Sequence, residues 1–504
     1  MTREGEMADD ATELGDSEAD KPRPGAPKPA KVFGVVGLGI FTFAFLANVN
    51  TTPQLAKFGL GAILLFVAAI VLFLGPTAMA SAEMGAGWPR TGGIYVWTRL
   101  AFGEGAGFMI IWLEWANFVV AWPGIMGTIT LQTAFAINPE LTNPDHPGRP
   151  ILLILVIIMV TWLAAAMALR GLRVASAFAW YSVIAGTVIP AVLLVVFAAA
   201  FLAQGNAPAM EVSPAALIPD IQWSNIAFIS GALLMFSGIE IAAIHGSDVR
   251  DPAKTIPRAN LIAVALCFIL FAPLTLAIAI IIPSDKIDIV VGLVESASVI
   301  FNQFNFGWLA PVFAFMVVTG LIAALVQIIN GPSRGLMVAG RQGGNLPPLL
   351  QKMNASKMPV AIIIAQASIS SVLSLGYAFL GTVQNAWFMF ALIQTNMTLI
   401  MYILMMAAVV KLRYTHPDVE RPYTIPGKKV GLWAVAIIGI LVCVLGLLIS
   451  FSPSAEAEGM PAGLYIAVLF FGTAAFVAMP FVFWIFRKPS WKTEVDPDLA
   501  KELI

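Results

Sequence analysis

The chain has 504 residues, of which 59% are hydrophobic and only 11% are charged. A soluble domain is about 45–50% apolar and about 25% charged, so the composition argues against a water-soluble enzyme, a nucleic-acid-binding protein, a disordered scaffold and a disulfide framework. The formal net charge of −1 says little, because in a membrane protein the position of charges matters more than their sum.

The first predicted segment is a tail over residues 1–31. It holds eight acidic and five basic residues and a proline-rich run from Lys21 to Pro29. Such a composition cannot bury enough apolar surface to fold. We therefore expect a disordered tail and no signal peptide.

Twelve apolar stretches follow the tail. A membrane helix needs about 20 mostly apolar residues, and a helix bonds its own backbone, as lipid demands. We therefore expect an all-α membrane protein with twelve transmembrane helices. The predicted spans are residues 32–52, 59–82, 104–134, 150–168, 175–203, 223–245, 258–283, 307–330, 359–380, 385–410, 431–451 and 463–486.

Basic residues lie mostly on one side of these predicted spans. An even number of spans places both termini on the same side, and that side carries 25 of the 28 Lys and Arg residues. The opposite side carries only Lys57, Arg149 and Lys286. The positive-inside rule then predicts that both termini are cytoplasmic. We expect a multi-pass protein of the inner or plasma membrane of the cell.

Two predicted spans carry helix-breaking or polar residues near their middles. The first contains the run Asn48–Pro53, and the sixth contains Ser237, Gly238 and Glu240. Breaks at matching places five spans apart favour an inverted-repeat transporter, in which freed backbone groups bind substrate or ions near the midplane. The alternative is that the first break is an extracellular helix end and the second a tight packing contact.

Two carboxylates lie deep in predicted spans, Glu114 in the third and Glu240 in the sixth. No Lys or Arg falls at comparable depth, and a carboxylate without a cation in hydrocarbon favours its neutral form. Both are candidates for proton coupling or amine recognition, and Glu240 is the stronger because it lies beside a break. For Glu114, a protonated and hydrogen-bonded structural role is an equal alternative.

Other chemistry is not indicated. The chain has no G-x-x-x-x-G-K-[ST] motif and no H-E-x-x-H motif, and Cys267 and Cys443 both lie inside apolar runs. We therefore expect no ATP-driven step, no catalytic site, no cofactor and no metal.

Three loops resemble signatures of the amino acid–polyamine–organocation (APC) superfamily. Ala82–Trp97 is similar to its segment between helices 2 and 3, Gly331–Leu336 with Asn345–Asn354 to that between helices 8 and 9, and His416–Gly427 to its loop after helix 10. The last two most resemble the glutamate/GABA antiporter branch. The resemblance covers about residues 32–486.

The resemblance implies a LeuT-like fold, with a 5+5 inverted repeat whose helices 1 and 6 are broken, plus two C-terminal helices. The chain would then divide into a ten-helix core (32–414), a cytoplasmic loop (415–430), helices 11 and 12 (431–486) and a cytoplasmic C-terminal tail (487–504). The resemblance also implies alternating-access transport of amino acids, by exchange or by proton-coupled uptake.

The same resemblance implies a substrate site at the two breaks. Tyr402 matches a helix 10 tyrosine that lines the pathway in the antiporter branch, whereas periodicity alone places it against either a pocket or a neighbouring helix. The expected coupling residues are Glu240 and Glu114. The expected substrate-binding residues are Ala47, Asn48, Val49, Asn50, Phe236, Ser237, Gly238, Ile239 and Tyr402.

Two positions depart from the family pattern. Leu46-Ala47-Asn48 stands where many members have Gly-Ser-Gly, and side chains there crowd backbone N–H groups that would otherwise contact a carboxylate. Trp180 lies near the place of a helix 5 lysine found in some relatives. The first departure argues against the usual recognition of an α-amino acid carboxylate, and the second argues against proton coupling through helix 5.

The leading hypothesis is an amino acid antiporter of glutamate/GABA type or a proton-coupled permease. Its partners would be an amino acid or amine substrate, the lipid bilayer and, in the coupled case, protons, with no nucleic acid. One alternative is a polyamine or amine permease, in which Glu114 and Glu240 bind a cationic substrate. Another is a non-transporting membrane receptor or scaffold.

Overall fold

In the computed structural model, the regular secondary structure of the described residues is helical, with an isolated bridge between Met353 and Pro359. The structure describes residues 34–46, 49–88, 93–143, 145–171, 180–240, 249, 251–375, 383–453 and 460–493, and the following statements refer to these. The predicted tail over residues 1–31 lies outside them, as do Ala47 and Asn48.

The helices follow the predicted apolar stretches closely. In chain order they are α2 (Val35–Leu46), η2 (Val49–Thr51), α3 (Thr52–Ala56), η3 (Gly59–Gly61), α4 (Ala62–Ala69), η4 (Ile70–Leu74), α5 (Gly75–Gly87), α6 (Gly93–Phe102), α7 (Glu104–Ile137), η5 (Pro139–Thr142), α8 (Arg149–Ala168), η6 (Ile184–Val188), α10 (Ile189–Ala203), η7 (Ala215–Leu217), α11 (Ala227–Met235), α13 (Pro252–Ile281), η9 (Ser284–Lys286), α14 (Gly292–Gln303), α15 (Leu309–Gly343), α16 (Val360–Leu375), α17 (Val383–Thr415), α18 (Lys428–Ser450), α19 (Ala462–Phe486) and η12 (Pro489–Trp491).

Nine helical stretches within the described residues are long and apolar enough to cross a membrane. They are the stretch ending in α5, α7, α8, the stretch ending in α10, α13, α15, α17, α18 and α19. The predicted number of twelve is therefore not confirmed. The other three predicted spans contain the short helices α2, α11 and α16. α2 and α16 adjoin residues outside the described part of the chain, whereas α11 is followed by the non-helical residues 236–240.

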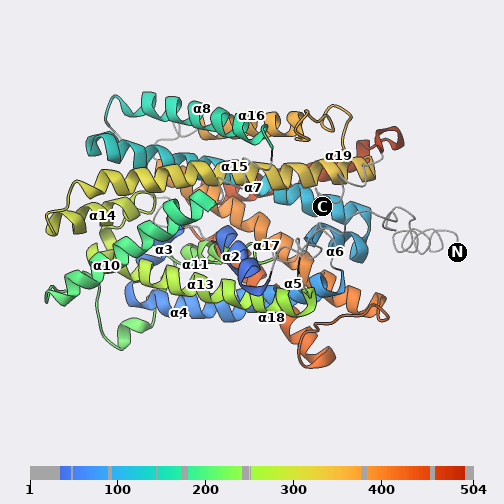
Figure 1. The fold of residues 1–504 in the computed structure, drawn as a ribbon, viewed down its shortest axis with the longest axis horizontal. Coiled ribbons are helices and arrows are strands. Elements are labelled where there is room, and N and C mark those ends of the chain that lie inside the picture. The colour runs from blue at the N-terminus through green and yellow to red at the C-terminus, as the bar shows by residue number, and fades with distance from the viewer. Residues whose placement is uncertain are drawn as a thin grey trace.

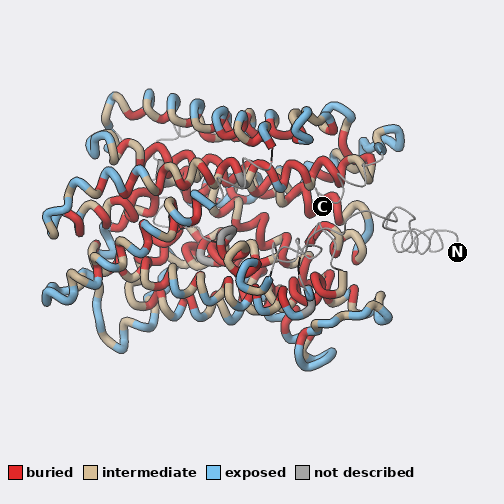
Figure 2. The backbone as a smooth tube through the Cα atoms, viewed as in Figure 1, coloured by how far each residue is buried: buried red, intermediate tan, exposed pale blue. Residues whose placement is uncertain are grey.

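The helices form a bundle with α7 and α17 near its middle. α15 packs along α7, α17 lies against both α7 and α18, and α13 covers α2. In Figure 1, α8 and α16 lie side by side along one edge, and α4 and α18 lie toward the opposite edge. Figure 2 shows buried positions concentrated in the middle, whereas the outer helices expose large apolar side chains, as lipid contact requires.

Part of the helical structure lies outside the spans that hydropathy predicted. α15 continues through Pro332 to Gly343, well past the expected end at residue 330. α6 and α14, of 10 and 12 residues, lie outside the predicted spans. A hydropathy window detects the apolar length that lipid requires, and it does not detect helix that continues past that length or is too short to span.

Helix is interrupted at both predicted breaks. α2 ends at Leu46, and a 3-10 turn covers Val49–Thr51. α11 ends at Met235, and the chain from 236 to 240 is not helical. Gly238 has a φ of +108°, a conformation that glycine adopts without the steric cost of a Cβ.

A buried ion pair joins α5 to α17 and to the loop that follows α17. Glu83 has a side chain only 1% exposed, and its carboxylate accepts hydrogen bonds from Arg413 Nε at 2.6 Å and from Arg413 Nη2. It also accepts from the Ile425 N–H at 2.8 Å, and Arg421 Nε lies 3.8 Å away. Glu83 therefore binds both α17 and the loop that follows it.

Arg421 fixes the loop that resembled a family signature. Its guanidinium donates to the main-chain oxygens of Leu412 and His416, at 2.8 and 2.7 Å, and lies 5.0 Å from the centre of the Trp88 ring. Burial, together with the neighbouring Arg421 charge, lowers the pKa of the His416 imidazole below its usual value. The contacts of Arg421 with Leu412, His416 and Trp88 hold the loop against α17 and the end of α5.

Replacing Glu83 with Gln should destabilise the protein, because Arg413 and Arg421 would lose their carboxylate. Removing one partner of a buried ion pair costs about 3–5 kcal/mol, so we expect a clearly lower thermal unfolding midpoint in detergent. Asp251→Asn is the control, since Asp251 pairs with Lys254 at 3.4 Å with both side chains mostly exposed, and Asn tolerates its φ of +47°. That change should cost less than about 1 kcal/mol. Equal losses would contradict the role of Glu83.

Candidate functional site

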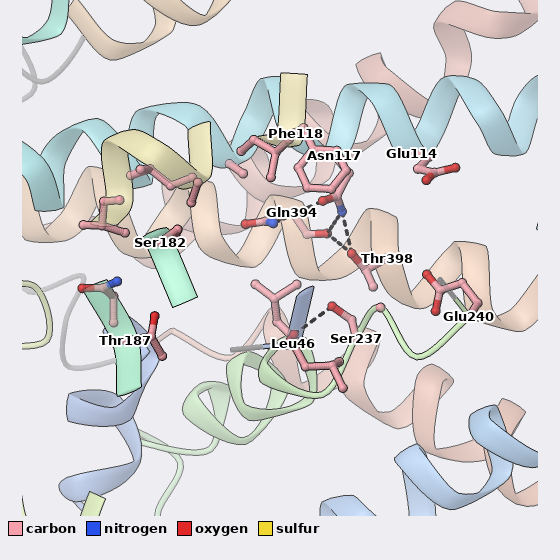
Figure 3. A pocket seen from close by; sticks show the side chains of 18 of the residues that line it. Leu46, Glu114, Asn117, Phe118, Ser182, Thr187, Ser237, Glu240, Gln394 and Thr398 are labelled. Atoms are coloured by element: carbon pink, nitrogen blue, oxygen red, sulfur yellow. Dashed lines mark hydrogen bonds between the residues drawn. The ribbon is translucent and has the colours of Figure 1, made fainter. Parts of the chain in front are cut away.

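A cavity of about 210 Å³ lies among α7, α15, α17, the helical stretch that contains η6, and the two helix interruptions (Figure 3). Pockets for drug-sized ligands measure about 300–1,000 Å³. The cavity therefore suits a small metabolite.

Two long helices each turn one face toward this cavity. Their lining residues recur at spacings of three and four, as one face of an α-helix requires. They are Glu114, Asn117, Phe118, Ala121 and Ile125 from α7, and Gln394, Thr398, Met401 and Tyr402 from α17.

Six of the predicted site residues line the cavity together. They come from the two interruptions, from α7 and from α17, which are far apart in sequence: Asn50, Glu114, Ser237, Gly238, Glu240 and Tyr402.

The remaining predicted residues do not line the cavity in the described structure. Val49, Phe236 and Ile239 are buried in the surrounding core, and the Phe236 ring packs edge-on against Phe66. Ala47 and Asn48 lie outside the described residues.

The Tyr402 hydroxyl bridges the interruption after α11. It accepts a hydrogen bond from the Gly238 N–H at 2.6 Å and donates to Glu240 Oε2 at 2.6 Å. The Tyr402 side chain is buried, and its ring packs edge-on against Phe73 with centroids 5.3 Å apart. One hydroxyl thus satisfies a backbone donor and a carboxylate that the helix interruption leaves inside the protein.

A second polar network joins α7 to α17 beside the cavity. Asn117 Nδ2 donates to the Gln394 main-chain oxygen at 3.1 Å and to Thr398 Oγ1 at 2.5 Å. Gln394 Nε2 donates back to Asn117 Oδ1 at 3.2 Å. These residues were not predicted from the sequence, because charges and helix breaks stand out in an apolar span whereas neutral amides and hydroxyls do not. The signal available was the neutral polar pair Gln394 and Thr398, four residues apart in an apolar span.

The cavity is acidic. Its titratable lining groups among the described residues are Glu114, Glu240 and Tyr402, and none of those lining residues is Lys, Arg or His. Glu114 is partly exposed to the cavity, and it makes no hydrogen bond to a described residue. Charge within the cavity is therefore negative or neutral.

Glycines bring α15 against the helix that contains η6. Gly186 and Gly320 both line the cavity, and a Cβ on either would overlap the Cα of the other. Trp180, which lies near the place of the helix 5 lysine of some relatives, is 58% exposed. Ser182 and Thr187 contribute the polar atoms of this segment to the cavity. Close backbone approach through small residues is a common way for membrane helices to pack.

The family pattern described as amino acid permease matches residues 30–476. The chain belongs to the amino acid permease family. This confirms the resemblance to the APC superfamily, and it makes the chain a multi-pass membrane transporter of the amino acid and polyamine class rather than an enzyme.

Three relatives show the range of this similarity. The chain is 31% identical to an uncharacterised transporter of Legionella pneumophila, over 91% of the chain and 97% of the relative. It is 27% identical to a glutamate/gamma-aminobutyrate antiporter of Lactococcus lactis, over 90% of each. It is 22% identical to a Lactococcus lactis protein named "probable agmatine/putrescine antiporter", over 82% of the chain and 86% of the relative.

Replacing Tyr402 with Phe should impair transport by about tenfold or more. The Gly238 N–H and the Glu240 carboxylate would lose their shared partner, and an unsatisfied buried donor costs about 1–3 kcal/mol, where 1.4 kcal/mol corresponds to a factor of ten. Substrate counterflow in proteoliposomes measures the effect. The control is Tyr414→Phe in the same helix, whose exposed hydroxyl accepts only from Trp433 Nε1 among the described residues. Similar rates for the two variants would refute the bridging role.

Replacing Gly320 with Ala should separate the two helices and destabilise the protein. A methyl group there overlaps the Gly186 backbone, and overpacking costs about 1–3 kcal/mol. Gly331→Ala in the same helix is the control, because an added Cβ there meets nothing within 4 Å, and alanine has the higher helix propensity. Thermal unfolding should show a loss for the first variant and no loss for the second; the reverse order would be inconsistent with close helix contact.

Proposed function

We propose that the chain is a secondary active transporter that moves amino acids across the membrane by alternating access. Its leading form is an antiporter of the glutamate/γ-aminobutyrate type, as two relatives are named, or a proton-coupled permease. The observation that carries this proposal is that Asn50 and the Ser237–Glu240 segment, from two separate helix interruptions, line one cavity. Interrupted helices that meet at a cavity are the usual construction of a transporter substrate site.

The proposal includes the architecture expected from the sequence. It has twelve spans, a LeuT-like 5+5 repeat over residues 32–414, and two further helices over 431–486, with both termini in the cytoplasm. The distribution of basic residues supports the orientation. Asn50, Ser237, Gly238 and Tyr402 would bind substrate, and Ala47, Asn48, Val49, Phe236 and Ile239 would complete or support the site.

A polyamine or amine permease is the second candidate. It is favoured by the two carboxylates of the cavity, since none of the described residues that line it is basic. A relative named for agmatine and putrescine supports the same reading. A cationic substrate would then be held through Glu114 and Glu240.

Exchange in proteoliposomes tests the proposed function. Vesicles containing the purified protein are loaded with unlabelled glutamate, γ-aminobutyrate, other amino acids or putrescine, and uptake of the labelled compound is followed. We expect uptake that requires an internal substrate for an antiporter, or a proton gradient for a coupled permease. Protein-free vesicles are the control. Absence of transport for every amino acid and amine would exclude the proposal, and competition by putrescine over glutamate would favour the second candidate.

A further inference from the structure

The two cavity carboxylates differ in what holds them. Glu240 accepts a hydrogen bond from Tyr402, which in turn is held by the Gly238 N–H. Glu114 lies about one helical turn before Phe118 on α7, is partly exposed to the cavity, and is not hydrogen-bonded to any described residue. Figure 3 shows both carboxylates at the same end of the cavity. Glu240 is therefore part of the helix interruption, whereas Glu114 is available to a ligand.

Among the described lining residues, no positively charged side chain lies beside Glu114. The titratable groups that line the cavity beside it are Glu240, from the segment after α11, and Tyr402, from α17. α15 and the η6 helix contribute only uncharged residues to the described lining. A carboxylate in such a low-dielectric space becomes anionic only with a cation beside it. A substrate ammonium group is a cation that can enter.

The uncharged donors of the cavity are largely engaged with one another. Asn117 Nδ2 donates to the Gln394 main-chain oxygen, and Gln394 Nε2 donates to Asn117 Oδ1. The Ser237 hydroxyl donates to the Leu234 oxygen at 2.8 Å. A substrate anion would therefore meet few free side-chain donors and no positively charged group among the described lining residues. Apolar side chains such as Ile125 and Met401 line the same space and suit an aliphatic chain.

We propose that Glu114 is the ligand for a substrate ammonium group, and that the transported compound is a small aliphatic amine or amino acid without net negative charge. This inference rests on the proposed transport function. It assigns different roles to the two glutamates, with Glu114 contacting substrate and Glu240 positioning the interruption through Tyr402. Glutamate, which is an anion at neutral pH, would be a poor substrate. Of the forms proposed above, this inference therefore retains transport of γ-aminobutyrate, other amino acids without net negative charge, or amines, and argues against glutamate exchange.

The test compares KM values for labelled putrescine and γ-aminobutyrate in proteoliposomes, with unlabelled glutamate as competitor. We expect Glu114→Gln to raise KM for both compounds at least tenfold, and Glu114→Asp to recover part of this loss. Thermal stability of Glu114→Gln should match or exceed that of the wild type, because no described hydrogen bond is removed. Glu295→Gln is the matched control: Glu295 is a partly buried glutamate of α14 that does not line the cavity, and its KM should stay within twofold.

The outcomes separate the inference from the function on which it rests. Transport by the wild type with an unchanged KM in Glu114→Gln would overturn the inference and leave the function intact. Stronger competition by glutamate than by putrescine or γ-aminobutyrate would also overturn the inference and leave the function intact. A large loss of thermal stability in Glu114→Gln, without recovery in Glu114→Asp, would instead assign Glu114 a structural role. Wild-type protein that transports none of the compounds would overturn both.

Discussion

A backbone polar group inside a bilayer must be hydrogen-bonded within the protein, and the interruption after α11 meets this requirement through one side chain. The Tyr402 hydroxyl accepts a hydrogen bond from the Gly238 N–H and donates one to Glu240 Oε2. Because Tyr402 belongs to α17, the interruption is anchored to the helix that lies at the centre of the bundle. The shape of the cavity therefore depends on the position of α17 relative to the non-helical residues 236–240.

The protein uses glutamate in three different electrostatic settings. Glu83, at the end of α5, is surrounded by guanidinium groups and ties three segments together. Glu240 is bonded to a neutral hydroxyl and stabilises a local conformation. Glu114 faces the cavity with no described hydrogen bond. The glutamate side chain thus serves as an ion-pair partner in Glu83, as a hydrogen-bond acceptor in Glu240 and as the proposed substrate ligand in Glu114. The role differs because the free energy of a buried charge depends on the groups that compensate it.

Much of this site was predictable because charges and helix breakers are conspicuous in apolar spans. Glu114, Glu240, Gly238 and Tyr402 were all expected and share one cavity. The neutral network around Asn117 was not expected, since single amides and hydroxyls are common in membrane helices and carry little signal. The continuation of α15 beyond residue 330 was not predicted for a different reason. Hydropathy detects the apolar part of a helix and does not detect a more polar part that follows it. The contact of Gly186 with Gly320 depends on tertiary packing alone.

That glycine contact also limits the kind of molecule that fits. Where Gly186 meets Gly320, the wall of the cavity is made of two main chains, and no side chain there can rotate aside to admit a wider guest. Rotation of a side chain therefore cannot widen the cavity on this wall, whereas α7 and α17 line the other walls with side chains over several turns. On the side of Gly186 and Gly320, the cavity can widen only if the two helices themselves move apart.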